Sequence, residues 1–145
     1  MEPNFWIAHL TRAGFHLANK MPDAAMASLQ RADQLADGST QATALLGSVL
    51  AREGRQEEAR AVLQRLLALE RTRYVPPTSV AAVHAGLGET DLALDALERA
   101  YTVRDTRLVY MKDAGRWASL RAQPRFIELM RKLKLDKYAH GAPAN

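Results

Sequence analysis

Apolar residues recur at steps of three and four along most of the chain, which is the spacing of one face of an α-helix. The pattern predicts helices over six ranges, namely 5–19, 23–36, 40–53, 56–71, 77–87 and 90–104. A further helix is predicted from Pro124 to about Leu135. Gly54 and Gly88 each precede a new periodic segment, where glycine can take a positive φ and let the next helix fold back. The sequence therefore predicts an all-α chain of helix–turn–helix units.

These units repeat with a period of 34 residues. Three segments align without a gap: MPDAAMASLQRADQLAD, RQEEARAVLQRLLALER and ETDLALDALERAYTVRD. Each has a small residue followed four positions later by Leu, in the pairs Ala25 and Leu29, Ala59 and Leu63, and Ala93 and Leu97. Small side chains let two helices approach closely, and Ala13, Gly47 and Ala81 supply the matching surface on the first helices. One pair cannot bury its own apolar stripe, so neighbouring pairs must stack.

The pattern resembles the tetratricopeptide repeat family, whose unit is a 34-residue helix–turn–helix. Leu46-Gly47 and Leu50 match positions of the family's first helix, and Ala59 and Leu63 match positions of its second. The family's large aromatic residues and closing proline are absent from all three units. The resemblance implies a right-handed α-solenoid of three repeats with a C-terminal capping helix. The expected repeats are 6–38, 39–72 and 73–105.

The two ends of the chain lie outside these units. Residues 1–5 resemble the end of a preceding repeat, because Pro3 lies one period before Asp37, in the slot of the family's closing proline. This favours a C-terminal piece of a longer array, while a natural start that uses Pro3-Asn4 as a helix entry is the alternative. Residues 106–136 are expected to cap the last repeat, and residues 137–145 to form a disordered tail.

The apolar face of the predicted capping helix consists of Phe126, Ile127, Met130 and Leu133. The run from Leu120-Arg121 to Leu129 resembles the segment that follows the last repeat in some bacterial regulatory proteins, where such arrays often follow a signalling or DNA-binding domain.

Charge changes the picture only at the C-terminal end. Residues 1–119 hold 14 Lys and Arg against 14 Asp and Glu, whereas residues 120–145 hold 6 against 2, which accounts for the net charge of +4. The basic residues of the last segment alternate with apolar ones, as on the solvated face of an amphipathic helix; they are Arg131, Lys132, Lys134 and Lys137. Weak nucleic-acid contact through this helix is therefore a second alternative function, and nucleic acid is not the expected partner.

No pattern in the chain indicates catalysis, a metal or a cofactor. Cysteine is absent, which excludes disulfides and thiolate metal sites. His16 and His84 occupy equivalent slots two repeats apart, so they are expected to pack in the core rather than share a metal. No basic, apolar leader and no long apolar stretch is present, so we expect a cytoplasmic protein that does not bind a membrane. No reactive constellation of residues is present either, so we expect that the chain is not an enzyme.

The remaining candidate site is the concave groove that the resemblance implies along the first helix of each pair. The matching residues are Ile7, Leu10, Gly14, Leu17, Gln41, Ala44, Ser48, Arg52, Val75, Thr78 and Ala82. Most are small and neutral, and only Arg52 is cationic, so the family's clamp for a terminal carboxylate is not expected. The expected function is a protein–protein interaction module of a larger regulatory or signalling protein, with a peptide or helix in the groove. The alternative is a self-association or scaffold module that forms a homodimer.

Overall fold

The computed structural model describes residues 5–36, 39–112 and 116–135. These residues form seven α-helices and two short 3₁₀ helices, and they contain no strand. The helices of the three repeats are α1 (Phe5–Ala18), α2 (Pro22–Leu35), α3 (Thr40–Arg52), α4 (Gln56–Leu69), α5 (Pro77–Gly86) and α6 (Thr90–Thr102). The segment after them contains η1 (Thr106–Lys112), η2 (Ala118–Leu120) and α7 (Pro124–Lys132).

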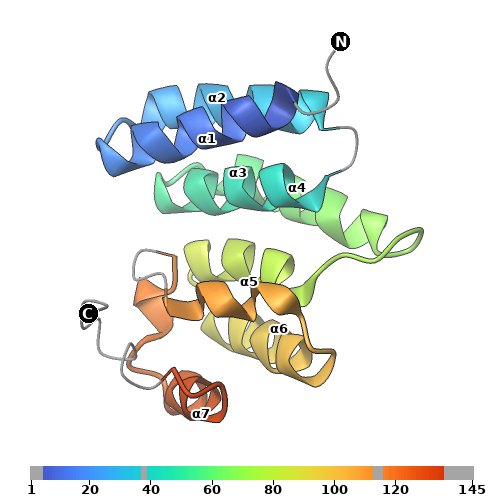
Figure 1. The fold of residues 1–145 in the computed structure, drawn as a ribbon, viewed down its shortest axis with the longest axis vertical. Helices are drawn as coiled ribbons and strands as arrows, with labels where there is room; N and C mark the ends of the chain where they lie inside the picture. Colours follow the sequence, from blue (N-terminus) through green and yellow to red (C-terminus); the bar gives the residue numbers. More distant parts are fainter. Residues whose placement is uncertain (1–4, 37–38, 113–115, 136–145) are drawn as a thin grey trace.

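Three helix pairs stack along the long axis of the molecule in the order α1–α2, α3–α4 and α5–α6 (Figure 1). The described chain is therefore a helical-repeat solenoid, which confirms the predicted all-α fold. All six repeat helices begin and end within two residues of the predicted ranges. The predicted end of a preceding repeat, apart from Phe5, and the predicted tail lie outside the described residues.

The same turn joins the two helices of each pair. Its residue with positive φ is Gly54 in the second pair, Gly88 in the third and Lys20 in the first, with φ values of 81°, 76° and 56°. Three backbone hydrogen bonds close these turns: Met21 N–H to His16 C=O (2.8 Å), Arg55 N–H to Leu50 C=O (2.9 Å) and Glu89 N–H to His84 C=O (3.0 Å). These partners are 34 residues apart from one turn to the next, so the repeat extends to individual backbone hydrogen bonds.

The small residues of the repeat lie where paired helices meet. Their side chains are fully buried; they are Ala13, Ala25, Ala59, Ala81 and Ala93. A first apolar cluster contains residues of the four helices from α1 through α4 and of the third repeat. A second cluster contains residues of α5, α6 and the C-terminal segment. Close helix contacts therefore follow from the sequence pattern, and the core runs along the stack rather than around one centre.

The last helix packs on α6, as the predicted cap requires. Phe126, Leu129 and Met130 are buried in the second cluster. Ile127, predicted on this face, is instead 36% exposed, because α7 turns Leu129 inward in its place. On the outer surface, Arg125 lies 2.6 Å from a carboxylate oxygen of Asp95 on α6 and 2.6 Å from one of Glu98.

The segment between α6 and α7 folds back over α5. Figure 1 shows η1, in orange, beside α5, and Arg107 Nη1 of η1 lies 3.4 Å from Ser79 Oγ of α5. Ser119 Oγ donates a hydrogen bond to the Ala85 carbonyl oxygen (3.3 Å), and Trp117 is buried in the second cluster with 1% of its surface exposed. The C-terminal segment therefore covers part of the first helix of the third repeat as well as its second helix. In the described part of the chain, no helix has the length and apolar character needed to span a membrane.

Candidate binding groove

Two adjoining hollows lie along the first helices of the three pairs. The first, of about 190 Å³, is lined by α1, α3, α5 and the C-terminal segment. The second, of about 800 Å³, is lined mainly by α1, α3 and the turn between α1 and α2. Both are lined by Leu45 and Arg116, so they form one surface, which we name the groove.

Nine of the eleven residues predicted from the sequence line this groove. The first hollow is lined by Leu10, Gln41, Ala44, Ser48, Thr78 and Ala82, and the second by Gly14, Leu17 and Arg52. Ile7 and Val75 line neither hollow. Ile7 is 43% exposed on α1, and Val75 is buried in the first cluster just before Pro76. Binding of a partner by these residues stays a prediction.

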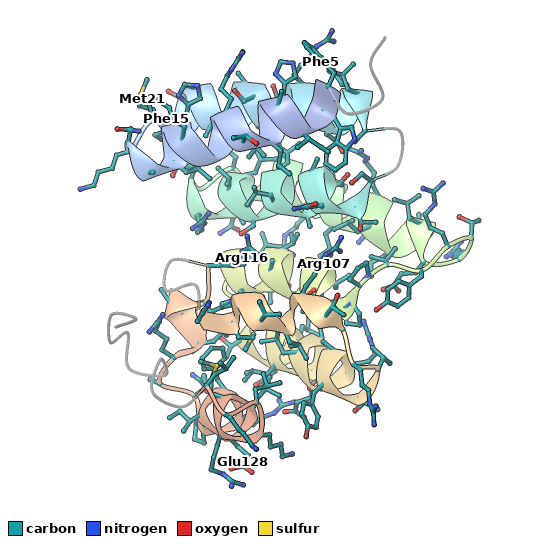
Figure 2. The ribbon with its side chains drawn as sticks, viewed as in Figure 1. Phe5, Phe15, Met21, Arg107, Arg116 and Glu128 are labelled. Atoms are coloured by element: carbon teal, nitrogen blue, oxygen red, sulfur yellow. The ribbon has the colours of Figure 1, made fainter. Side chains whose placement is uncertain are left out.

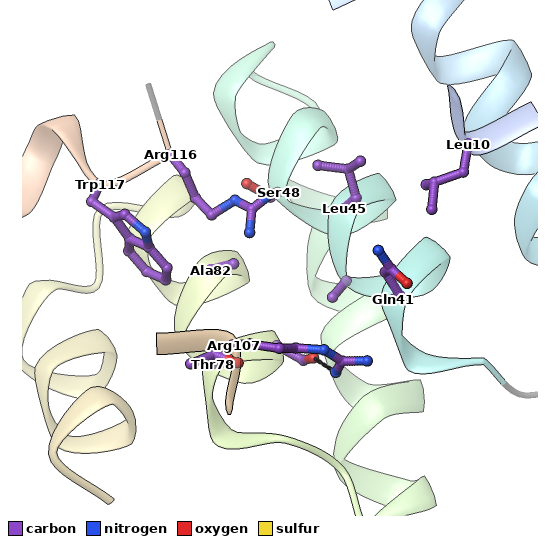
Figure 3. A pocket seen from close by; sticks show the side chains of 11 residues that line it. Leu10, Gln41, Leu45, Ser48, Thr78, Ala82, Arg107, Arg116 and Trp117 are labelled. Carbon is purple, nitrogen blue, oxygen red and sulfur yellow. Dashed lines mark hydrogen bonds between the residues drawn. The ribbon is translucent and has the colours of Figure 1, made fainter. Parts of the chain in front are cut away.

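The C-terminal segment contributes three groove residues that the sequence pattern did not indicate. They are Arg107 at the start of η1, Arg116, and Trp117 just before η2. Figure 3 shows the guanidinium groups of Arg107 and Arg116 extending into the first hollow between α3 and α5. In the sequence, these residues are marked only by the break in the 34-residue period after residue 105, which shows where the repeat pattern ends.

Asp105 fixes the backbone that carries Arg107. This carboxylate is 7% exposed and accepts hydrogen bonds from the backbone N–H (3.1 Å) and the hydroxyl (2.7 Å) of Thr78, and from the N–H of Arg107 (2.9 Å). Thr78 lies in the first turn of α5, whose N–H groups have no partner within the helix, so Asp105 also caps α5. The Arg107 guanidinium then lies 3.4 Å from Ser79 Oγ, at the rim of the first hollow.

Cationic residues outnumber carboxylates around the groove. In the described part of the chain, it is lined by the cationic side chains of Lys20, Arg52, Arg107 and Arg116 and by one carboxylate, that of Glu53. Its floor is uncharged and consists mainly of small or aliphatic side chains, with Ala44 and Ala82 almost fully buried. A cleft with one sign of charge concentrates its electric field on what enters it. The arrangement can therefore hold an extended or helical segment without any covalent chemistry.

The predicted packing histidines lie away from the groove. His84 Nδ1 lies 3.1 Å from Glu89 Oε1, and Arg60 of α4 lies 3.2 Å from the other oxygen of the same carboxylate, so this contact ties the second repeat to the third. Burial acts to raise the pKa of Glu89, but the hydrogen bonds with His84 and Arg60 outweigh it and lower that pKa below its ordinary value. Among the described residues, no three His, Asp or Glu side chains form a group that could hold a metal ion.

Stacked helix pairs with a groove along their first helices define a helical-repeat protein. The family model for the tetratricopeptide repeat matches residues 16–75, so this part of the chain is similar to the family that the sequence pattern resembles. Repeats of this family generally mediate protein–protein interaction. Comparison with curated proteins and with solved structures gives no match.

Proposed function

We propose that this chain is a non-catalytic protein-interaction module that binds a peptide or helix of a partner protein in the groove. The single observation that carries the proposal is the alignment of Leu10, Gln41, Ala44 and Ala82 along one continuous hollow that crosses all three helix pairs. A segment laid along it would contact α1, α3 and α5 at once. This is the geometry by which grooves between helices recognise peptides.

Filling the groove is expected to weaken peptide binding. Gln41 is exposed at its edge, so Gln41→Trp places an indole there without entering the core. Short random peptides are displayed and selected on the wild-type protein, and their dissociation constants are measured by fluorescence polarisation. We expect Gln41→Trp to weaken the selected peptides by at least about tenfold, the effect of losing roughly 1.4 kcal/mol.

The matched control is Gln64→Trp, the same substitution at an exposed site on α4 outside the groove. It is expected to leave the affinities unchanged. Failure to select any peptide that distinguishes the two variants would contradict the proposed function.

Self-association is the second candidate, and the outer surface of α1 favours it. Phe5 and Phe15 are 47% and 64% exposed, and Met21 in the following turn is 46% exposed. Figure 2 shows these three side chains at the margin of the molecule. They lie at both ends of α1, with Phe15 and Met21 at one end and Phe5 at the other. Large exposed apolar residues are typical of interaction sites, and a second copy of the chain can cover them symmetrically.

Phe15→Glu is expected to keep the chain monomeric. Light scattering over a dilution series measures the mass; a self-associating wild type exceeds 16.1 kDa at high concentration, whereas this variant stays at that mass. Leu92→Glu, at an apolar residue of α6 that is 49% exposed, is the control and should behave as the wild type. A wild-type chain that remains monomeric at every concentration would exclude this candidate.

A regulatory role in a larger bacterial protein, a cytoplasmic location and weak nucleic-acid contact stay predictions from the sequence.

A further inference from the structure

We propose that the groove recognises an internal acidic segment of its partner, with carboxylate side chains bound by Arg107 and Arg116 and an apolar side chain on the floor between them. This inference rests on the proposed function and adds the chemistry of the ligand. The chemistry follows from the two cations, Arg107 and Arg116, that the C-terminal segment adds to the groove.

The charge around the groove is unbalanced. Among the described residues, four cationic side chains and one carboxylate line it, whereas Lys and Arg equal Asp and Glu over residues 1–119 as a whole. Positive charge is therefore concentrated on this surface. Arg107 and Arg116 both line the first hollow, and none of its described lining residues is a carboxylate. Complementary charge on a ligand raises both its rate of encounter and its specificity.

The placement of the two guanidinium groups also favours an acidic ligand. Figure 3 shows Ala82 between them, with Leu45 and Gln41 facing the same space from α3. A guanidinium group can bind a carboxylate through two parallel N–H···O hydrogen bonds. Both arginines are half-buried, so water and salt screen such a pair less than on an open surface.

The small floor residues specify what lies between the two ion pairs. Ala44 and Ala82 leave space that an aliphatic side chain of the ligand can fill, and Leu10 and Leu45 provide an apolar wall. Figure 3 shows the two guanidinium groups on either side of Ala82. Two acidic side chains that flank an apolar residue match this arrangement, so the expected ligand is an internal stretch of chain.

The test uses the displayed peptides that Gln41→Trp binds more weakly than the wild type does. They are presented as internal inserts and then synthesised with amidated C-termini, so that none has a free terminal carboxylate. Each is paired with a version in which Asp and Glu are replaced by Asn and Gln. Affinities are measured on the full chain, on Arg107→Gln/Arg116→Gln and on Arg12→Gln/Arg71→Gln, whose exposed arginines line neither hollow.

We expect the selected peptides to be enriched in Asp and Glu, to lose about tenfold in affinity for each groove arginine removed, and to bind more weakly as salt is raised. The Arg12 and Arg71 variant should bind as the wild type does, and circular dichroism checks that all variants fold. Neutral peptides that bind the groove equally well, and are indifferent to Arg107 and Arg116, would overturn the acidic-ligand proposal while leaving the proposed function intact. Absence of any groove-dependent peptide would overturn both.

Discussion

Replacement of Trp117 with alanine is expected to lower the free energy of unfolding by about 3–5 kcal/mol, the usual cost of deleting a buried aromatic side chain. The indole is only 1% exposed and packs in the second cluster, in the segment that covers α5. Its removal leaves a cavity that the surrounding helices can fill only in part. Urea denaturation followed by circular dichroism measures the change.

The loss of stability in Trp117→Ala should be confined to the C-terminal end of the stack. Each repeat contacts only its neighbours, so a defect in the second cluster weakens α5, α6 and α7 before it affects α1 and α2. Hydrogen exchange is therefore expected to accelerate in the last two repeat helices and in α7. Val109→Ala, at a residue of η1 that is 55% exposed, should change stability by less than about 0.5 kcal/mol. A Trp117→Ala protein as stable as this control would show that the C-terminal segment does not stabilise the repeats.

Much of the helical architecture could be predicted because its causes are local. Pro77 and Pro124 fix where α5 and α7 begin, and Gly54 and Gly88 fix where two first helices end. The period of 34 residues then places the small contact residues in phase. The turn between α1 and α2 has no such local signal. Lys20 takes the same left-handed conformation as the two glycines because the surrounding backbone hydrogen bonds impose it, and nothing in its side chain signals this.

The candidate groove was predictable only where the repeats make it. Gln41, Ala44 and Ser48 follow from their position on the first helix of a repeat. Arg107 and Arg116 do not, because they lie in a segment without helical periodicity whose path depends on tertiary contacts. The Asp105 carboxylate and the buried Trp117 set that path. The charge of the groove is therefore a property of the folded chain that the repeat pattern cannot provide.

Gly86→Ala is expected to destabilise the protein by about 1–3 kcal/mol, even though alanine is the better helix former. A Cβ at this position would lie 2.9 Å from Ala51 Cβ and 3.0 Å from the backbone oxygen of Ser48. Neither atom can rotate away, so α5 must move off α3. The equivalent positions of the first two repeats hold Ala18 and Arg52, which is why the repeat pattern gives no sign of this contact.

Gly14→Ala provides the matched control, because the substitution is identical and only the surroundings differ. A Cβ on Gly14 meets nothing within 4 Å, so the lower backbone entropy of alanine is expected to stabilise α1 by about 0.5–1 kcal/mol. Chemical denaturation of the two variants should therefore give shifts of opposite sign. If both substitutions stabilise the protein, helix propensity outweighs packing at Gly86. In that case α3 and α5 are not in the close contact on which a continuous groove floor depends.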